Sequence, residues 1–259
     1  MNFAITVLGS GSRGNAILVH NAGNAILVDA GFSRKALLEK LSAAGINPCI
    51  IRALLISHEH GDHVDGVRLF SDELGIPAYL TMKTAASLEE TGKLGKKKVL
   101  FETGSVFDIG GFQIRPFAVP HDAIDPVGFV ISSGDARAGI ATDLGHINSL
   151  CMQRLKDCDA LILESNHDVE MQNRSDRNMR LKRRVLGKHG HLSNEDAINS
   201  FEELVTERTK YVFLVHLSSD CNEYELVLRT ARAKLDGLGR PDVKLIIVCQ
   251  DKASETIWI

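Results

Sequence analysis

Long apolar runs are missing from this 259-residue sequence: no stretch of about 18 uncharged apolar residues occurs, so no segment is predicted to cross a membrane. The N-terminal residues Met1-Asn2-Phe3-Ala4 also lack the basic start and the long apolar segment of a signal peptide. We therefore expect a cytoplasmic protein that has no membrane partner.

Cysteine is scarce and scattered. The five cysteines are odd in number and form no C-x-x-C pair, so neither a disulfide framework nor a zinc knuckle is predicted. They are expected to be small buried apolar residues. Their positions are Cys49, Cys151, Cys158, Cys221 and Cys249.

A basic excess is also lacking, since the formal net charge is −3, whereas nucleic-acid-binding domains usually carry a clear positive charge. The distribution is nevertheless uneven. Between residues 174 and 188 seven Lys and Arg residues accompany only Asp176, with Lys182-Arg183-Arg184 at the centre. Such a stretch fits equally a solvated helix face and a phosphate-binding surface.

The sequence does contain a dense histidine cluster. Ser57-His58-Glu59-His60-Gly61-Asp62-His63 directly follows the apolar run from Ala53 to Ile56. Histidines two residues apart lie on one side of an extended segment, and Asp62-His63 can face a second ion once the chain turns into a helix. The alternative is a polar loop at a strand end. Three of only ten histidines within six residues favour a metal site.

The order of the predicted elements indicates the fold class. The chain opens with three antiparallel strands (3–8, 16–20 and 25–28), and a helix at 33–44 and a buried strand at 53–56 follow. Further along we expect helices at 64–74, 84–90, 193–205 and 223–235, and strands at 78–80, 105–109, 111–119, 127–132, 138–142, 160–163, 211–215 and 243–248. This mixture predicts two sheets packed face to face, with helices outside, in one domain of residues 1–259.

Three later strands each end at a polar residue that could complete a metal site. His121, Asp143 and His216 follow the apolar strands that end at Val119, Thr142 and Val215. Any one of them could be an ordinary turn residue. Their repeated position after a strand favours ligands that converge at one edge.

Taken together, these motifs resemble the metallo-β-lactamase fold, and more narrowly its YycJ/WalJ-like branch. The motifs are Ser10-Gly11-Ser12-Arg13-Gly14-Asn15, Val28-Asp29-Ala30-Gly31, the histidine cluster, His121-Asp122-Ala123, Ala141-Thr142-Asp143-Leu144-Gly145, Glu164-Ser165-Asn166-His167-Asp168, Gly190-His191-Leu192-Ser193-Asn194-Glu195-Asp196 and His216-Leu217-Ser218.

The resemblance implies a four-layer αββα sandwich with a two-metal centre and a metal-dependent nuclease, with 5′-to-3′ DNA exonuclease activity proposed for this branch. Members of the fold are related to tRNase Z and to cyclic phosphodiesterases. Some relatives carry an aromatic-Pro segment before Lys182-Arg183-Arg184, and this chain does not. Base stacking is therefore not expected at that place.

The resemblance also implies the roles of single residues. One ion would be held by His58, His60 and His121, the other by Asp62, His63 and His216, with Asp143 bridging both and Asp29 orienting a ligand histidine. His191 would bind phosphate and act as a general acid, with Glu164 as its partner. Catalytic roles thus fall on Asp62, Asp143, His191 and Glu164, and nucleic-acid contact on His191, Lys182, Arg183 and Arg184.

The expected chemistry is in-line attack on phosphorus by a hydroxide that two ions, roughly 3.5 to 4 Å apart, would hold. Imidazole and carboxylate ligands suit Zn²⁺ first, with Mn²⁺ and Fe²⁺ as competitors. The favoured substrate is DNA. The alternatives are RNA, a small cyclic phosphodiester, a thioester, and a non-enzymatic binding module in which metal holds the fold.

Overall fold

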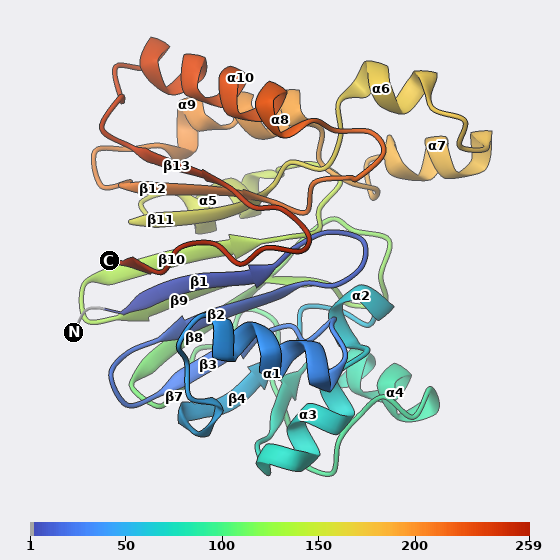
Figure 1. The fold of residues 1–259 in the computed structure, drawn as a ribbon, viewed down its shortest axis with the longest axis vertical. Helices are drawn as coiled ribbons and strands as arrows, with labels where there is room; N and C mark the ends of the chain where they lie inside the picture. The colour runs from blue at the N-terminus through green and yellow to red at the C-terminus, as the bar shows by residue number, and fades with distance from the viewer. Residues whose placement is uncertain (1–2) are drawn as a thin grey trace.

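Two stacked β-sheets form the centre of the molecule in our computed structural model, which describes residues 3–259 (Figure 1). Met1 and Asn2, the start of the N-terminal segment considered above, lie outside the described residues. Helices cover the outer face of each sheet, so the order of layers is αββα. The predicted fold class is confirmed.

The first sheet contains the chain's opening strands and its last one. Its order, within residues 3–259, is β14-β1-β2-β3-β4-β5-β6. β1 pairs antiparallel with β14 and β2, whereas β3 to β6 run parallel to one another. The strands are β1 Ala4–Gly9, β2 Ala16–His20, β3 Ala25–Val28, β4 Ile51–Leu55, β5 Ala78–Leu80, β6 Lys98–Leu100 and β14 Ile257–Trp258.

The second sheet has the order β13-β12-β11-β10-β9-β8-β7. β10 to β13 are parallel, while β7, β8 and β9 join them through antiparallel pairs, so that β8 points the same way as β10. The strands are β7 Phe107–Ile109, β8 Phe112–Ala118, β9 Val127–Ser133, β10 Ala136–Ala141, β11 Ala160–Glu164, β12 Tyr211–Val215 and β13 Lys244–Ile247.

The helices divide between the two outer faces. Apolar residues of α1, α3 and α4 pack on the first sheet, and those of α5, α8, α9 and α10 on the second. None of the helices that the structure describes is long and apolar enough to cross a membrane. The helices are α1 Arg34–Ala43, the 3₁₀ turn η1 Pro48–Ile50, α2 Gly61–Val64, α3 Val67–Leu74, α4 Met82–Glu90, α5 Ser149–Leu155, α6 Val169–Arg174, α7 Met179–Val185, α8 Asn194–Asn199, α9 Phe201–Leu204 and α10 Tyr224–Gly237.

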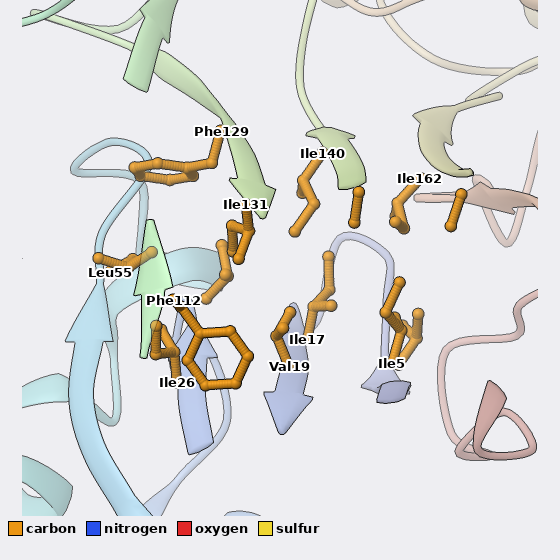
Figure 2. Packing of buried hydrophobic residues seen from close by; sticks show 14 of the residues in the cluster. Ile5, Ile17, Val19, Ile26, Leu55, Phe112, Phe129, Ile131, Ile140 and Ile162 are labelled. Carbon is orange, nitrogen blue, oxygen red and sulfur yellow. The ribbon is translucent and has the colours of Figure 1, made fainter. Parts of the chain in front are cut away.

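A dry core joins the two sheets (Figure 2). In β2, Ile17 and Val19 point into this inter-sheet core, whereas the alternating Leu18 points to the outer layer that contains α1. From the other sheet, Ile140 faces Ile17 across the gap. Because both faces of these strands are buried, their sequences are continuous apolar runs.

Two predicted helices are wrong in detail. The expected helix 193–205 is divided at Ser200 into α8 and α9. The expected helix 64–74 is two helices, α2 and α3, separated at Asp65-Gly66. The amide of Gly66 donates to the carbonyl of Ala30 at 2.8 Å, and a Cβ on Gly66 would lie 2.0 Å from the carbonyl oxygen of Phe32. The close approach of the loop after β3 therefore interrupts the helix, and it also brings α2 against that loop.

The carboxyl ends of β3 and β4 in the first sheet, and of β8, β10, β11 and β12 in the second, meet at one edge of the sandwich. α2 lies at this edge, and α6 and α7 project beside it, apart from the other outer helices (Figure 1). A hydrogen bond of 3.0 Å from the amide of Val127 to the carbonyl of Ser57 ties the two sheets together there.

Candidate metal centre

Three histidines from both sheets form the first part of a cluster at this edge. His58 and His60 follow β4, and His121 follows β8. One ring nitrogen from each lies within 4.8 Å of the others, and Nε2 of His121 is 3.2 Å from Nδ1 of His60. Two ligands of a tetrahedral zinc ion lie at about this distance, given bonds of about 2.0 to 2.1 Å. The arrangement is therefore that of a ligand triad.

A second triad lies beside the first. Helix α2 carries Asp62 and His63, and His216 follows β12; ligand atoms from all three also lie within 4.8 Å of one another. Oδ2 of Asp62 is 3.6 Å from Nε2 of His63 and 3.4 Å from Nε2 of His216. The sequence prediction that these residues converge is met, and their role as ligands stays a prediction.

Asp143, which follows β10, lies between the two triads. Oδ2 is 2.9 Å from Nε2 of His63, and Oδ1 is 3.3 Å from Nδ1 of His216 and 3.7 Å from Nε2 of His121. Its side chain is only 4% exposed. This is the position that a carboxylate shared by two cations would occupy.

Unsatisfied buried atoms test whether cations fit here. Nε2 of His58, Nε2 of His216 and Oδ2 of Asp143 are buried and make no hydrogen bond within the described residues. Leaving such atoms unpaired is costly, on the order of 1 to 3 kcal/mol each. All three point into the cluster, where a divalent cation would satisfy them, so the residues present fit a metal centre.

In four of the histidines, Nδ1 makes a hydrogen bond to a neighbouring oxygen. The other ring nitrogen, Nε2, then faces the centre. A ring nitrogen that donates to an oxygen sets the tautomer and the orientation of a metal-ligating histidine. The four Nδ1 contacts are His58 to Ser57 Oγ (2.9 Å), His63 to Asp29 Oδ2 (2.7 Å), His121 to the carbonyl of Gly190 (2.9 Å) and His216 to Glu164 Oε1 (2.8 Å).

Asp29 contacts His63, as the resemblance led us to expect, and its orienting role stays a prediction. Its Oδ2 accepts from His63 and from the hydroxyl of Ser57, and its Oδ1 accepts the amide of Ser57 at 2.8 Å. Asp29 and His216 both have left-handed backbone conformations, with φ of 59° and 58°. Non-glycine residues seldom adopt this conformation, and it costs of order 1 to 3 kcal/mol. The fold therefore holds strained backbone at two residues of the centre.

Glu164, at the end of β11, contacts more of the centre than the sequence analysis foresaw. Its Oε1 accepts from Nδ1 of both His191 (2.7 Å) and His216, and its Oε2 accepts the amides of Leu144 (2.9 Å) and Leu192 (3.1 Å). The side chain is fully buried. Glu164 thus orients both the proposed phosphate-binding histidine and a proposed ligand.

Charge interactions within the cluster shift its pKa values in opposite directions. Burial, together with the nearby His63, holds the pKa of His58 well below its usual value. Burial also opposes protonation of His216, yet the carboxylates of Asp143, Asp62 and Glu164 together outweigh it and raise the pKa of His216 to about 10. Although Asp143 is buried, His216 and His63 hold its pKa well below the usual range. Asp143 is therefore ionised at neutral pH, as a metal ligand must be.

The glycine- and serine-rich turn of residues 10–15 makes hydrogen bonds to residues of the centre. Its sequence alone did not reveal this role. Oδ1 of Asn15 accepts from the hydroxyl of Ser10 (2.7 Å), whose oxygen accepts the amide of His216 (2.9 Å). Nδ2 of Asn15 lies 3.0 Å from Nε2 of His63. A Cβ on Gly31 would lie 1.6 Å from the carbonyl oxygen of Asp62, so only glycine fits there.

A cavity of about 630 Å³ opens over the centre. From the cluster it is lined by His60, Asp62, His191 and His216. Nδ1 of His191 is committed to Glu164, so Nε2 is the ring atom left for the cavity. The carboxylate of Glu164 overcomes the effect of burial and raises the pKa of His191.

Two arginines line the same cavity on the side of α6 and α7. Arg184, held by the carboxylate of Asp122 at 3.1 Å, was predicted from the basic stretch. Arg177, paired with Asp220 at 2.8 Å, belongs to that stretch but had no distinguishing signal. The cavity lining does not include Lys182 or Arg183, and Nζ of Lys182 instead donates to the carbonyl of Asn173 at 2.6 Å.

Comparison with known proteins assigns the family. A model described as the β-lactamase superfamily domain matches residues 24–217. This chain belongs to the metallo-β-lactamase superfamily. Exodeoxyribonuclease YycJ of Bacillus anthracis is 33% identical to this superfamily member over 241 residues, which are 92% of this chain and 91% of YycJ. Exodeoxyribonuclease WalJ of Streptococcus pneumoniae serotype 2 is 34% identical, over 89% of this chain and 87% of WalJ.

A solved structure gives the same fold. The metallo-β-lactamase fold protein YhfI of Bacillus subtilis matches 98% of this chain and 99% of its own with a TM-score of 0.75, at 19% identity. The resemblance to the YycJ/WalJ-like branch is therefore confirmed, and this metallo-β-lactamase superfamily member is a metal-dependent hydrolase. Its His/Asp clusters indicate divalent metal ions, whose identity and number stay predictions.

Proposed function

We propose that this hydrolase is a nuclease that cleaves DNA as an exonuclease. The observation that carries the proposal is the 630 Å³ cavity, which places the His/Asp cluster beside His191, Arg177 and Arg184. Phosphodiester cleavage needs cations at the reacting phosphate and positive groups on its neighbours, and this cavity offers both. The relatives at 33–34% identity are named exodeoxyribonucleases, which supports DNA as the substrate.

The proposed metal content is two divalent ions, Zn²⁺ first and Mn²⁺ or Fe²⁺ next. One ion would be held by His58, His60 and His121, and the other by Asp62, His63 and His216, with Asp143 touching both. Bound divalent ions would supply Lewis acidity at the phosphate and lower the pKa of water.

The chain's own groups bind and orient the substrate. His191 directs Nε2 into the cavity, because Glu164 holds Nδ1, and this nitrogen donates to a phosphate oxygen or passes its proton to the leaving oxygen. Arg184 is braced by Asp122 and presents a planar donor pair to a neighbouring phosphate. Asp122 thereby fixes one phosphate contact relative to His121, its neighbour in the chain.

The rest of the lining suggests which part of a nucleic acid is read. Besides its imidazoles, the cavity has no aromatic ring among the described residues, and Leu181 and Val185 are its apolar side chains. Base stacking is therefore a small part of binding, and contacts to phosphate dominate. This suits an enzyme that removes nucleotides regardless of sequence. Cytoplasmic location stays a prediction.

End-labelled single- and double-stranded DNA and RNA, each digested with defined metals, test the proposal. Stepwise shortening of DNA from one end, abolished by Asp143→Ala at equal metal loading, is the expected result. Parallel assays with a chromogenic phosphodiester and lactoylglutathione cover the other hydrolase classes. Hydrolysis of the thioester without any phosphodiester would overturn the nuclease proposal, and cleavage of RNA alone would replace DNA by RNA as the substrate.

A pair of histidines sharpens the test. His191 lines the cavity, whereas His189, two residues earlier, is exposed and is not part of the lining. Loss of a group that donates a proton in the reaction typically costs about 10²- to 10⁴-fold in rate. We expect this loss in kcat for His191→Ala and none for His189→Ala. Equal turnover of the two variants would remove His191 from the mechanism.

A further inference from the structure

A second polar cavity, of about 260 Å³, lies on the outer face of the second sheet. Arg115 of β8, Arg137 of β10 and Arg154 of α5 all line it. In the strand register, Arg115 pairs with Val130, and Arg137 pairs with Ser132, two residues further along β9 on the same face. Two of the arginines thus extend from the outer face of the sheet, at neighbouring positions of its register, and the third extends from helix α5.

None of these three guanidinium groups has a partner in the part of the chain that the structure describes. Within residues 3–259 their side chains form no ion pair and no hydrogen bond, and Nε of Arg154 is buried without an acceptor. The carboxylate of Asp159 accepts the backbone amide of Arg137, but it pairs with the side chains of Arg208 and Lys210 instead. The cavity therefore concentrates positive charge in a chain whose net charge is −3.

Three like charges in one half-enclosed cavity repel one another, and an anion removes this cost. Arginine forks match the oxygens of phosphate in paired hydrogen bonds, and the side-chain amides of Gln113 and Gln153 add further donors at the cavity wall. The apolar part of the lining is Val130, and none of the described lining residues is aromatic, so no ring can stack on a base. The cavity is thus suited to phosphate groups alone.

We propose that this cavity is a phosphate-binding site distinct from the candidate metal centre. Arg137 and the proposed ligand Asp143 are separated by six residues along and just beyond β10, which corresponds to roughly 20 Å of extended chain. One phosphate cannot reach both places. The bound phosphate belongs either to a nucleic-acid strand whose end lies in the metal centre or to a free phosphoanion such as diphosphate.

Calorimetric titration of the metal-loaded protein with inorganic diphosphate tests the site directly. We compare wild type with the triple variant Arg115→Gln, Arg137→Gln and Arg154→Gln. The wild type is expected to show one binding event more than the triple variant, because diphosphate also binds at the metals in both proteins. Turnover of a small chromogenic phosphodiester should be equal in the two, which keeps this test separate from the proposed nuclease activity.

Binding of a long labelled single strand of DNA, measured by fluorescence anisotropy, identifies the source of the phosphate. This part of the test rests on the proposed nuclease function. The slope of log affinity against log salt changes by about 0.7 for each phosphate of a single strand that the protein neutralises, so losing the phosphate held in this cavity should lower the slope by about 0.7. A lower slope indicates a nucleic-acid strand in the site. An unchanged slope together with lost diphosphate binding indicates a free phosphoanion.

Controls separate this site from general charge. The triple variant Arg68→Gln, Lys83→Gln and Arg229→Gln removes the same charge from exposed residues outside both cavities, and it should behave as wild type. The single variant Arg137→Gln serves if the first triple variant does not fold, with a weaker loss in the same direction. Identical diphosphate binding and identical salt slopes for wild type and the cavity variants would overturn the proposal.

Discussion

The substitution Glu164→Gln probes the orientation of two histidines at once. The carboxylate of Glu164 accepts four hydrogen bonds, two from imidazoles and two from backbone amides, in a fully buried site. A glutamine keeps the shape but has one accepting oxygen and one donating NH₂ group. If its oxygen takes the two amides, its NH₂ faces Nδ1 of His191 and of His216.

His216 must then carry its proton on Nε2, the atom that points into the centre. A hydrogen bond to a charged group contributes roughly 1.5 to 3 kcal/mol to stability. Loss of two such bonds would therefore cost about 3 to 6 kcal/mol if the rings did not rearrange. Loss of an orienting partner typically weakens metal binding by about 10- to 100-fold. We expect that loss for Glu164→Gln, and reduced turnover even at saturating metal, because His191 loses its partner as well.

Competition with a chromogenic chelator measures the metal affinity, and hydrolysis of a chromogenic phosphodiester measures turnover. The matched control is Asp168→Asn, which makes the same exchange of oxygen for NH₂ at the N-cap of α6. There the side chain accepts the amide of Met171 at 2.9 Å, and among the described residues it forms no hydrogen bond to an imidazole. The control should bind metal as wild type does. A folded Glu164→Gln protein with wild-type metal affinity and turnover would refute the reasoning.

Three further predictions follow from single positions. Arg184→Ala should weaken polynucleotide binding and lower its salt slope by about 0.7, whereas Arg183→Ala, outside the cavity, should leave the slope unchanged; equal slopes would contradict the role of Arg184. Gly31→Ala should lose about 3 kcal/mol or more of unfolding free energy in urea, because its Cβ would lie 1.6 Å from a carbonyl oxygen, while Gly23→Ala, with nothing within 4 Å, should unfold as wild type. Burial raises the pKa of the Cys151 thiol to about 11, so about one thousandth of it is thiolate at pH 8. Alkylation of Cys151 should therefore require denaturant, and labelling of the native protein at the rate of an exposed thiol would contradict this.

The sequence predicted those parts of the centre that depend on local spacing. His58, His60, Asp62 and His63 lie in one short segment, and any strand that runs into helix α2 brings them together. The convergence of His121, Asp143 and His216 also followed, because each ends a strand and β8, β10 and β12 point the same way.

Contacts that depend on tertiary placement were not predicted. Glu164 and His216 are 52 residues apart, and their hydrogen bond requires the parallel register in which Glu164 pairs with Val215. Likewise, Arg177 and Arg183 are indistinguishable in a basic stretch, and only the placement of α6 and α7 puts the first in the cavity and the second outside it. The break at Gly66 was missed because the loop after β3, which is distant in sequence, causes it.

The centre joins the two sheets, and this links metal binding to folding. In each triad two residues belong to the segment that follows β4 of the first sheet, and one follows a strand of the second sheet: His121 in the first triad and His216 in the second. A cation held by either triad therefore cross-links the sheets at the edge where the inter-sheet core ends. Because the unfolded chain cannot assemble these side chains, an ion that binds them would add its binding free energy to the stability of the sandwich. By reciprocity, any loosening of the inter-sheet packing around Ile17 and Ile140 must weaken metal affinity, even though neither side chain touches the centre.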